Sequence, residues 1–110
     1  MDETKTIYDI FKEMGGMNME FALKKSNLHH AFEYEKDGHR LAEITWVESD
    51  GVMTMDHTYV SDELRGQGVA KKLLDEAVNY ARTNQLKMKP VCSYVVAAFE
   101  KSEVYDDIKL

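Results

Sequence analysis

Hydrophobic and polar positions follow two different periods along the chain. Between Met19 and Val60 they form short runs typical of half-buried β-strands. Between Val69 and Ala81 apolar residues recur every three to four positions, with charged residues on the opposite face, as in an amphipathic helix. A β-rich first half followed by a long helix predicts a protein of the α+β class.

Two Asp–Gly pairs divide the β-rich region. Asp37–Gly38 and Asp50–Gly51 have the composition that two-residue hairpin turns favour. The short break Ser26–Asn27 separates one further strand. The four predicted strands, which form an antiparallel meander, cover 19–25, 28–36, 39–48 and 52–60.

The helical period predicts about four turns over 68–84, with Asn84 as the C-cap. A fifth strand is expected from residue 86 to 94 or 95, interrupted at Pro90 because proline cannot donate to the ladder. A last short helix is expected over 96–103. The strand–helix–strand crossover makes the fifth strand parallel to the fourth. The predicted sheet is therefore five-stranded, mixed and mostly antiparallel.

A separate amphipathic segment precedes the first strand. Its apolar residues fall at i, i+3, i+4 and i+7, Thr4 is available as N-cap, and Gly15 ends the pattern. We therefore expect an N-terminal helix or extension over 1–16 and a compact domain over 17–110. The apolar residues of this segment are Ile7, Ile10, Phe11 and Met14.

Composition and charge restrict the class of function. With 110 residues, 44% of them hydrophobic and 31% charged, the chain has the size and core content of one globular domain. Its net charge of −6 disfavours nucleic acid as the main ligand and suits cationic or amine-bearing partners, although solubility alone also explains it. We expect a monomer or a weak homodimer.

The same sequence predicts a cytoplasmic location and no membrane insertion. No apolar run approaches the roughly 20 residues of a membrane-spanning helix. The N-terminus begins with acidic residues and has no apolar core after a basic stretch, as a secretory signal would. A single cysteine excludes an internal disulfide framework and favours a reducing compartment.

The turn before the long helix carries the first candidate chemistry. Backbone N–H groups at a helix start have no partners within the helix, and the helix dipole adds partial positive charge, so this turn can hold a phosphate or pyrophosphate. Lys71 and Lys72 add local positive charge to an otherwise acidic chain. Neither the P-loop nor the dinucleotide-binding glycine pattern matches. The structural alternative is a tight strand-to-helix turn without a ligand.

The residues of this turn also fit a third pattern. Arg65, Gly68 and Ala70 fill Gln/Arg-x-x-Gly-x-Gly/Ala, which resembles the acetyl-CoA pyrophosphate motif of the GCN5-related N-acetyltransferases. Over 19–108 the chain is similar to a short single-domain branch of that superfamily, which lacks the usual pair of helices between the first two strands. The further segments that resemble this branch are Asp56–His57–Thr58, Val91–Cys92–Ser93 and Tyr105–Asp106–Asp107.

This resemblance implies a minimal acyl-CoA N-acyltransferase fold with an extra N-terminal helix. Acetyl-CoA would lie in a V-shaped opening between the fourth and fifth strands, here 55–60 and 90–94, with its pantetheine paired to the fourth strand. The resemblance implies that acetyl-CoA or coenzyme A is bound by a group of residues around the glycine turn. These are Val60, Arg65, Gly66, Gln67, Gly68, Val69, Ala70, Lys71 and Lys72.

Cys92 and His57 are the candidate catalytic residues. A lone cysteine is more often a small buried hydrophobe than a nucleophile, and a lone strand histidine is more often structural. Cys92 is nevertheless expected on the strand that flanks the thioester, with His57 on the opposing strand, and both match suspected active-site residues of the short branch. His57 could take the proton of an attacking amine, or Cys92 could accept the acetyl group first.

Two functions follow. The first is acetyl transfer from acetyl-CoA to an amine acceptor, which is a protein lysine, a polyamine or a small amine. The second is a coenzyme A-binding or protein-interaction module with little catalysis, since the resemblance implies that the usual substrate-contributing helices are absent.

Tyr94 and Tyr105 are candidates to protonate the leaving thiolate. No metal is expected, because the adjacent His29 and His30 point to opposite faces of a strand.

Overall fold

The computed structural model describes residues 19–110. The helix predicted over 1–16 and the domain boundary at residue 17 lie outside the described residues. The described elements comprise five strands, two α-helices and two short 3₁₀ helices. They are β1 (Ala22–Ser26), β2 (His29–Lys36), β3 (His39–Ser49), β4 (Val52–Val60), η1 (Asp62–Leu64), α2 (Val69–Thr83), β5 (Lys87–Pro90), α3 (Ser93–Lys101) and η2 (Glu103–Tyr105).

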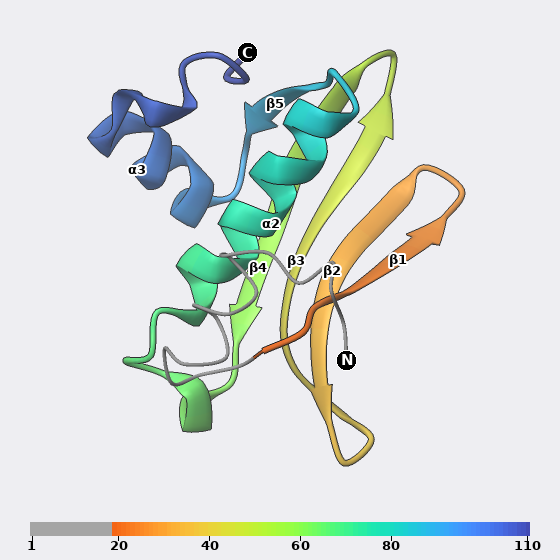
Figure 1. Cartoon of the computed structure of the whole chain (residues 1–110), viewed down its shortest axis with the longest axis vertical. Helices are drawn as coiled ribbons and strands as arrows, with labels where there is room; N and C mark the ends of the chain where they lie inside the picture. Colours follow the sequence, from red (N-terminus) through yellow and green to blue (C-terminus); the bar gives the residue numbers. More distant parts are fainter. Residues whose placement is uncertain (1–18) are drawn as a thin grey trace, which may run out of the picture.

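The five strands form one mixed sheet in the order β1-β2-β3-β4-β5, which confirms the predicted architecture (Figure 1). The first three pairings are antiparallel and the last, between β4 and β5, is parallel. Both Asp–Gly turns take positive φ at each central residue, 53° and 80° at Asp37 and Gly38, and 54° and 78° at Asp50 and Gly51. This is the geometry that matches the twist of a two-residue hairpin.

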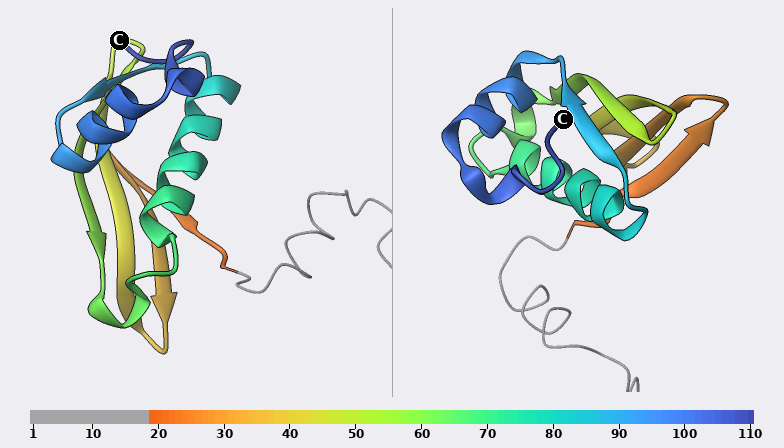
Figure 2. Two further views of the ribbon diagram at one scale, coloured as in Figure 1. Left: turned by 90° about the vertical axis from the view of Figure 1, so that its left-hand side faces the viewer. Right: turned by 90° about the horizontal axis from the view of Figure 1, so that it is seen from above.

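Helix α2 lies across one face of the sheet, and α3 lies beside it at the β5 edge (Figure 2). The core between α2 and the sheet contains fully buried side chains from both layers, such as Trp46, Met55 and Leu73. The opposite face carries no helix within residues 19–110. Below, these are called the helix face and the open face of the sheet. No helix in the described part of the chain is long and apolar enough to cross a membrane.

The predicted fifth strand was wrong beyond Pro90. β5 ends at that residue, Cys92 is the N-cap of α3, and the helix begins at Ser93 rather than near residue 96. Proline ends the ladder because it lacks an N–H. The apolar run after it has helical period, since Val95 and Phe99, four residues apart, are both buried.

The C-terminal segment closes the free edge of β5. Met88 donates its N–H to the Ile108 carbonyl at 2.7 Å and accepts from Leu110 N–H at 2.9 Å. Arg82 of α2 forms a two-point ion pair with Asp107, with both N···O distances at 2.9 Å. The segment Tyr105–Asp106–Asp107 therefore has a structural function, because it fastens the chain end to α2.

Candidate active site

Strands β4 and β5 part where Met55 meets Pro90. Up to that pair the strands run parallel, and the N–H groups of Val91 and Cys92 then both donate to the Met55 carbonyl, at 3.1 and 2.9 Å. β4 continues over 56–60 with no strand on this side in the described chain (Figure 1). The last part of β4 thus has a free backbone edge, at the position where the resemblance implies a bound pantetheine.

A β-bulge in β4 determines which side chains reach each face beyond this point. Asp56 has no partner in β3, whereas Met55 and His57 on either side of it are both paired. One extra residue inverts the alternation of side chains. Met55 is fully buried, His57 turns to the open face, and Thr58 lies opposite the buried Ile44 on the helix face.

His57 meets a shielded carboxylate on the open face. Its side chain is 56% exposed, and its Nε2 lies 3.4 Å from Oε2 of Glu43, whose side chain is only 12% exposed. The other carboxylate oxygen of Glu43 lies 3.4 Å from Nε of Arg40. Sequence reasoning missed Glu43. Its side chain points to the open face in the alternation of β3, one strand away from His57, but this proximity can be deduced only once the bulge is known.

A second imidazole–carboxylate pair lies on the same face. His29 Nε2 is 3.6 Å from Asp56 Oδ2, and the Thr45 hydroxyl donates to Asp56 Oδ1 at 2.5 Å. The two pairs do not combine into a metal centre, since residues 19–110 contain no group of three or more potential metal-binding side chains.

Cys92 lies on the helix face and contacts Thr58. Its Sγ is 3.3 Å from the Thr58 hydroxyl oxygen, and the side chain packs against the core. His57 is the residue before Thr58 in β4 and therefore points the other way. The structure places both candidate catalytic residues beside the separation of β4 and β5, but it does not bring them together as a thiol–imidazole pair.

The glycine turn has the geometry that an anion site needs. Gly66 and Gly68 take φ of 81° and 72°, and a Cβ on either would meet no atom within 4 Å, so the approach to the backbone is open. Gly68 is the N-cap of α2 and no side chain caps the helix. Its first N–H groups are therefore available to a pyrophosphate. The described residues fit the cofactor that the motif implies.

The remaining residues of the turn fall into three groups. Arg65 pairs with Asp62 at 3.0 Å and the Gln67 side chain donates to the Glu63 carbonyl at 3.3 Å, so both fold back along η1. Val60 and Val69 pack into or against the core and offer only backbone to a ligand. Ala70 and Lys72 are partly buried in the first turn of α2, and Lys71 is exposed there.

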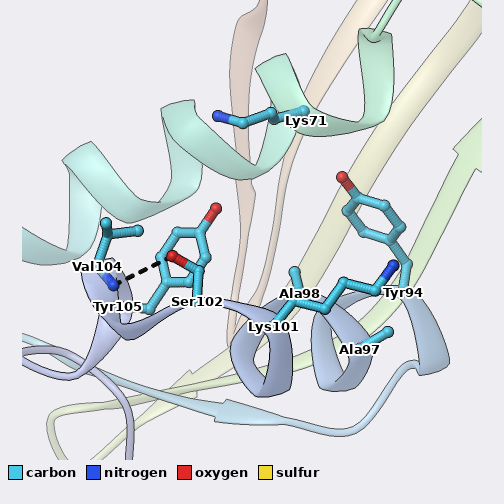
Figure 3. A pocket seen from close by; sticks show the side chains of 8 residues that line it. All are labelled: Lys71, Tyr94, Ala97, Ala98, Lys101, Ser102, Val104 and Tyr105. Atoms are coloured by element: carbon cyan, nitrogen blue, oxygen red, sulfur yellow. Dashed lines mark hydrogen bonds between the residues drawn. The ribbon is translucent and has the colours of Figure 1, made fainter.

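A groove of about 430 Å³ lies between α2 and α3. Figure 3 shows the hydroxyl groups of Tyr94 and Tyr105 directed toward α2, which carries Lys71. Sequence reasoning named the two tyrosines and Lys71 but did not bring them together, because it ran the fifth strand to residue 94 or 95 and so placed Tyr94 on a strand. The other residues of this groove are Ala97, Ala98, Lys101, Ser102 and Val104.

Two groups of the groove have shifted pKa values. Burial raises the pKa of the Tyr94 phenol, and the nearby Tyr105 and Asp75 raise it further while Lys71 opposes them. The hydrogen bond and charge of Asp75, 3.0 Å away, raise the pKa of Lys71. At neutral pH the groove therefore presents a protonated phenol and an ammonium group.

Comparisons with known proteins agree with this geometry. A family profile described as GCN5-related N-acetyl-transferase matches residues 31–108, well over half of the chain. No curated protein sequence matches the chain. A GCN5-like protein from Staphylococcus aureus, described provisionally as an N-acetyltransferase and solved by NMR, is 40% identical over 81% of this chain and 87% of its own, with a TM-score of 0.62.

Two further solved structures share the fold at low identity. The ribosomal-protein-S18-alanine N-acetyltransferase from Escherichia coli is 13% identical, with a TM-score of 0.58 over 70% of this chain and 53% of its own. The ribosomal-protein-alanine N-acetyltransferase from Brucella melitensis is 22% identical, with a TM-score of 0.55 over 78% of this chain and 66% of its own. This chain thus spans about half to two thirds of the length of these two proteins.

The chain belongs to the GCN5-related N-acetyltransferase family. It is therefore an acyltransferase, and the family's acyl donor is acetyl-CoA. The predictions of family, enzyme class and donor are confirmed. The amine acceptor and the roles of individual residues remain proposals.

Proposed function

We propose that the chain transfers an acetyl group from acetyl-CoA directly to a primary amine that approaches from the open face of the sheet. The observation that carries this proposal is the end of β4–β5 pairing at Met55, which leaves 56–60 as free strand edge leading to the glycine turn. Five extended residues span about 17 Å. That length suits an extended pantetheine arm between a pyrophosphate at Gly68 and a thioester beside Met55.

The donor would be held mainly by backbone groups. The uncapped N–H groups at the start of α2 suit the pyrophosphate, and the free edge of β4 suits the amides of the pantetheine. Lys71 and Lys72 supply the positive charge near the phosphates that the acidic chain otherwise lacks. Cys92 would line the thioester position from the helix face, where it packs against Thr58.

His57 is the proton acceptor in this proposal. It lies on the open face, two residues after Met55, and its imidazole is more than half exposed to an incoming amine. The amine nitrogen attacks the thioester carbon, a C–N bond forms, and the C–S bond breaks with its electron pair on sulfur. His57 takes the ammonium proton and releases it to solvent. This arrangement requires no acetylated cysteine.

Tyr94 is the proton donor for the leaving sulfur. Its phenol lines the groove on the helix face, in the first turn of α3 and two residues after Cys92. Its raised pKa keeps it protonated at neutral pH, so it can give a proton to the thiolate and regain one from solvent. Proton uptake and proton donation then take place on opposite sides of the sheet.

The acceptor is proposed to be a lysine side chain on an exposed protein segment. No helix of residues 19–110 walls the open face, and the hollow beside His29 and Glu43 is shallow, at about 210 Å³. Such a face can receive an amine carried by a large partner. The net charge of −6 favours a cationic one.

Release of the free coenzyme A thiol tests this function. We would compare a lysine-containing peptide, spermidine and a simple alkylamine as acceptors for the full chain. We expect the peptide to give the highest kcat/KM, and His57→Gln to lower kcat while the control His39→Gln does not. A preference for spermidine overturns the acceptor class. No release above background with any amine, together with intact acetyl-CoA binding, supports the binding-module alternative instead.

A further inference from the structure

The carboxylate of Glu43 is held at two points on the open face. Oε1 lies 3.4 Å from Nε of Arg40 and Oε2 lies 3.4 Å from Nε2 of His57. The Glu43 side chain is 12% exposed, whereas those of Arg40 and His57 are 52% and 56% exposed. The Glu43 carboxylate, largely shielded from solvent, thus lies within ion-pair distance of an exposed guanidinium and of an exposed imidazole.

The place of the Glu43 carboxylate beside Nε2 favours one form of the imidazole. A neutral histidine carries its proton on one ring nitrogen and a lone pair on the other. A carboxylate beside Nε2 favours the tautomer protonated there, which leaves the lone pair on Nδ1. Among the described residues, the contact of the His57 imidazole with a carboxylate is at Nε2. Nδ1 is then the ring nitrogen that can accept a proton on the open face.

We propose that Glu43 is a positioning residue for His57. It holds the imidazole in the tautomer that can accept the amine's proton at Nδ1, and its negative charge stabilises the imidazolium that results. This inference rests on the proposed direct transfer. In that step the amine nitrogen bonds to the thioester carbon as the C–S bond breaks, the surplus ammonium proton passes to Nδ1 and then to solvent, and the thiolate gains its proton from Tyr94.

The surroundings of His57 allow Glu43 to be tested separately from its neighbours. Thr45 lies directly across on β3, Tyr59 follows on the same face of β4, and Glu33 on β2 lies opposite Glu43. Lys89 of β5 lies opposite Thr54, earlier on β4. His29 belongs to the separate pair with Asp56. Among the carboxylates of the described residues, that of Glu43 lies within ion-pair distance of His57.

Glu43→Gln is the informative variant because it keeps the shape and removes the charge. We expect kcat to fall by about tenfold or more, less than the roughly 10⁴-fold loss when the carboxylate of a buried serine-protease triad is neutralised. The KM for acetyl-CoA stays unchanged. Glu43→Asp, which keeps the charge, restores part of kcat.

Nitrogen-15 NMR of the histidine side chains gives a readout besides activity. The wild-type chain should show His57 in the tautomer protonated at Nε2, and Glu43→Gln should show a mixture. His39→Gln, which lies outside both imidazole–carboxylate pairs, should leave both the spectrum of His57 and kcat unchanged.

The outcomes separate this inference from the function on which it rests. If His57→Gln lowers kcat but Glu43→Gln changes neither kcat nor the tautomer, Glu43 has no positioning role and direct transfer stands. If His57→Gln is also without effect, His57 is not the base and both proposals about these residues fail. If the wild-type chain releases no coenzyme A with any amine, the proposed function itself fails.

Discussion

The hydroxyl oxygen of Thr58 lies 3.3 Å from Sγ of Cys92, and this contact fixes the only thiol of the chain on the helix face of the sheet. His57, the next residue back along β4, reaches Glu43 on the open face. The unpaired Asp56 between Met55 and His57 causes this division, because it inverts the alternation of side chains. The thiol and the imidazole therefore cannot activate one another directly.

Direct transfer predicts that Cys92→Ala retains turnover. Cys92 is the N-cap of α3 but makes no side-chain capping bond, so the substitution removes no cap. We expect kcat within about tenfold of the wild-type value, whereas loss of an acid or base contributes about 10² to 10⁴. Steady-state release of coenzyme A measures this. A loss above a hundredfold, with an acetyl group trapped on Cys92 of the wild-type chain in mass spectra, would establish the covalent route instead.

Tyr94→Phe tests proton donation on the helix face. Removing the phenol should lower kcat by about a hundredfold, at the lower end of general acid effects, and leave acetyl-CoA binding in place. Because the pKa of the Tyr94 phenol is raised above the usual 10.0, its deprotonation should not reduce the wild-type rate at any pH below 10. Tyr34→Phe, on β2, is the matched control. Equal rates for wild type and Tyr94→Phe would remove Tyr94 from the mechanism.

The ion pair between Arg82 and Asp107 predicts acid sensitivity of the chain end. Hydrogen bonding to Arg82 lowers the pKa of Asp107 below its usual 3.8. The stability that the ionised Asp107 contributes is thus fully present above pH 3.8, and it is lost as the pH falls through the lowered pKa. Asp107→Asn should lower Tm at pH 7, and the difference from wild type should shrink at the acid end.

The control for this effect is Asp106→Asn, since the ion pair of Asp106 among residues 19–110 is local, with Lys109 at 3.3 Å. A smaller Tm change than in Asp107→Asn is expected, because Asp107 joins the chain end to α2 whereas the Asp106 pair is local. A Tm difference for Asp107→Asn that stays constant from pH 7 to pH 2 would show that the carboxylate charge is not the source of its stability.

Local signals in the sequence were sufficient for most of the fold. The Asp37–Gly38 and Asp50–Gly51 turns and the 3.6-residue period of α2 each act over a few residues, and the strands β2 to β4 and the helix α2 follow the predicted bounds closely. The segment after Pro90 was misjudged, because a short apolar run suits a strand or a helix equally, and only the burial of Val95 and Phe99 in the core decides between them.

The candidate site was less accessible to sequence reasoning. The glycine turn is a continuous motif, so its residues could be named. The separation of His57 from Cys92 depends on one bulge residue, Asp56, which has no signature in a single sequence. Glu43 reaches His57 through the pairing of β3 with β4, and a contact across strands becomes visible only when the register is known.

The most direct test of acetyl-CoA binding at the glycine turn is calorimetric titration of coenzyme A and acetyl-CoA into three forms of the chain. Gly68→Glu places bulk and negative charge at the helix start, and Gly51→Glu imposes the same change at a distant hairpin with similar φ, 78° against 72°. We expect micromolar binding, about −8 kcal/mol, by the wild type and Gly51→Glu, and a weakening of at least about tenfold in Gly68→Glu. Equal affinity in all three forms, or no binding by the wild type, would contradict the proposed site.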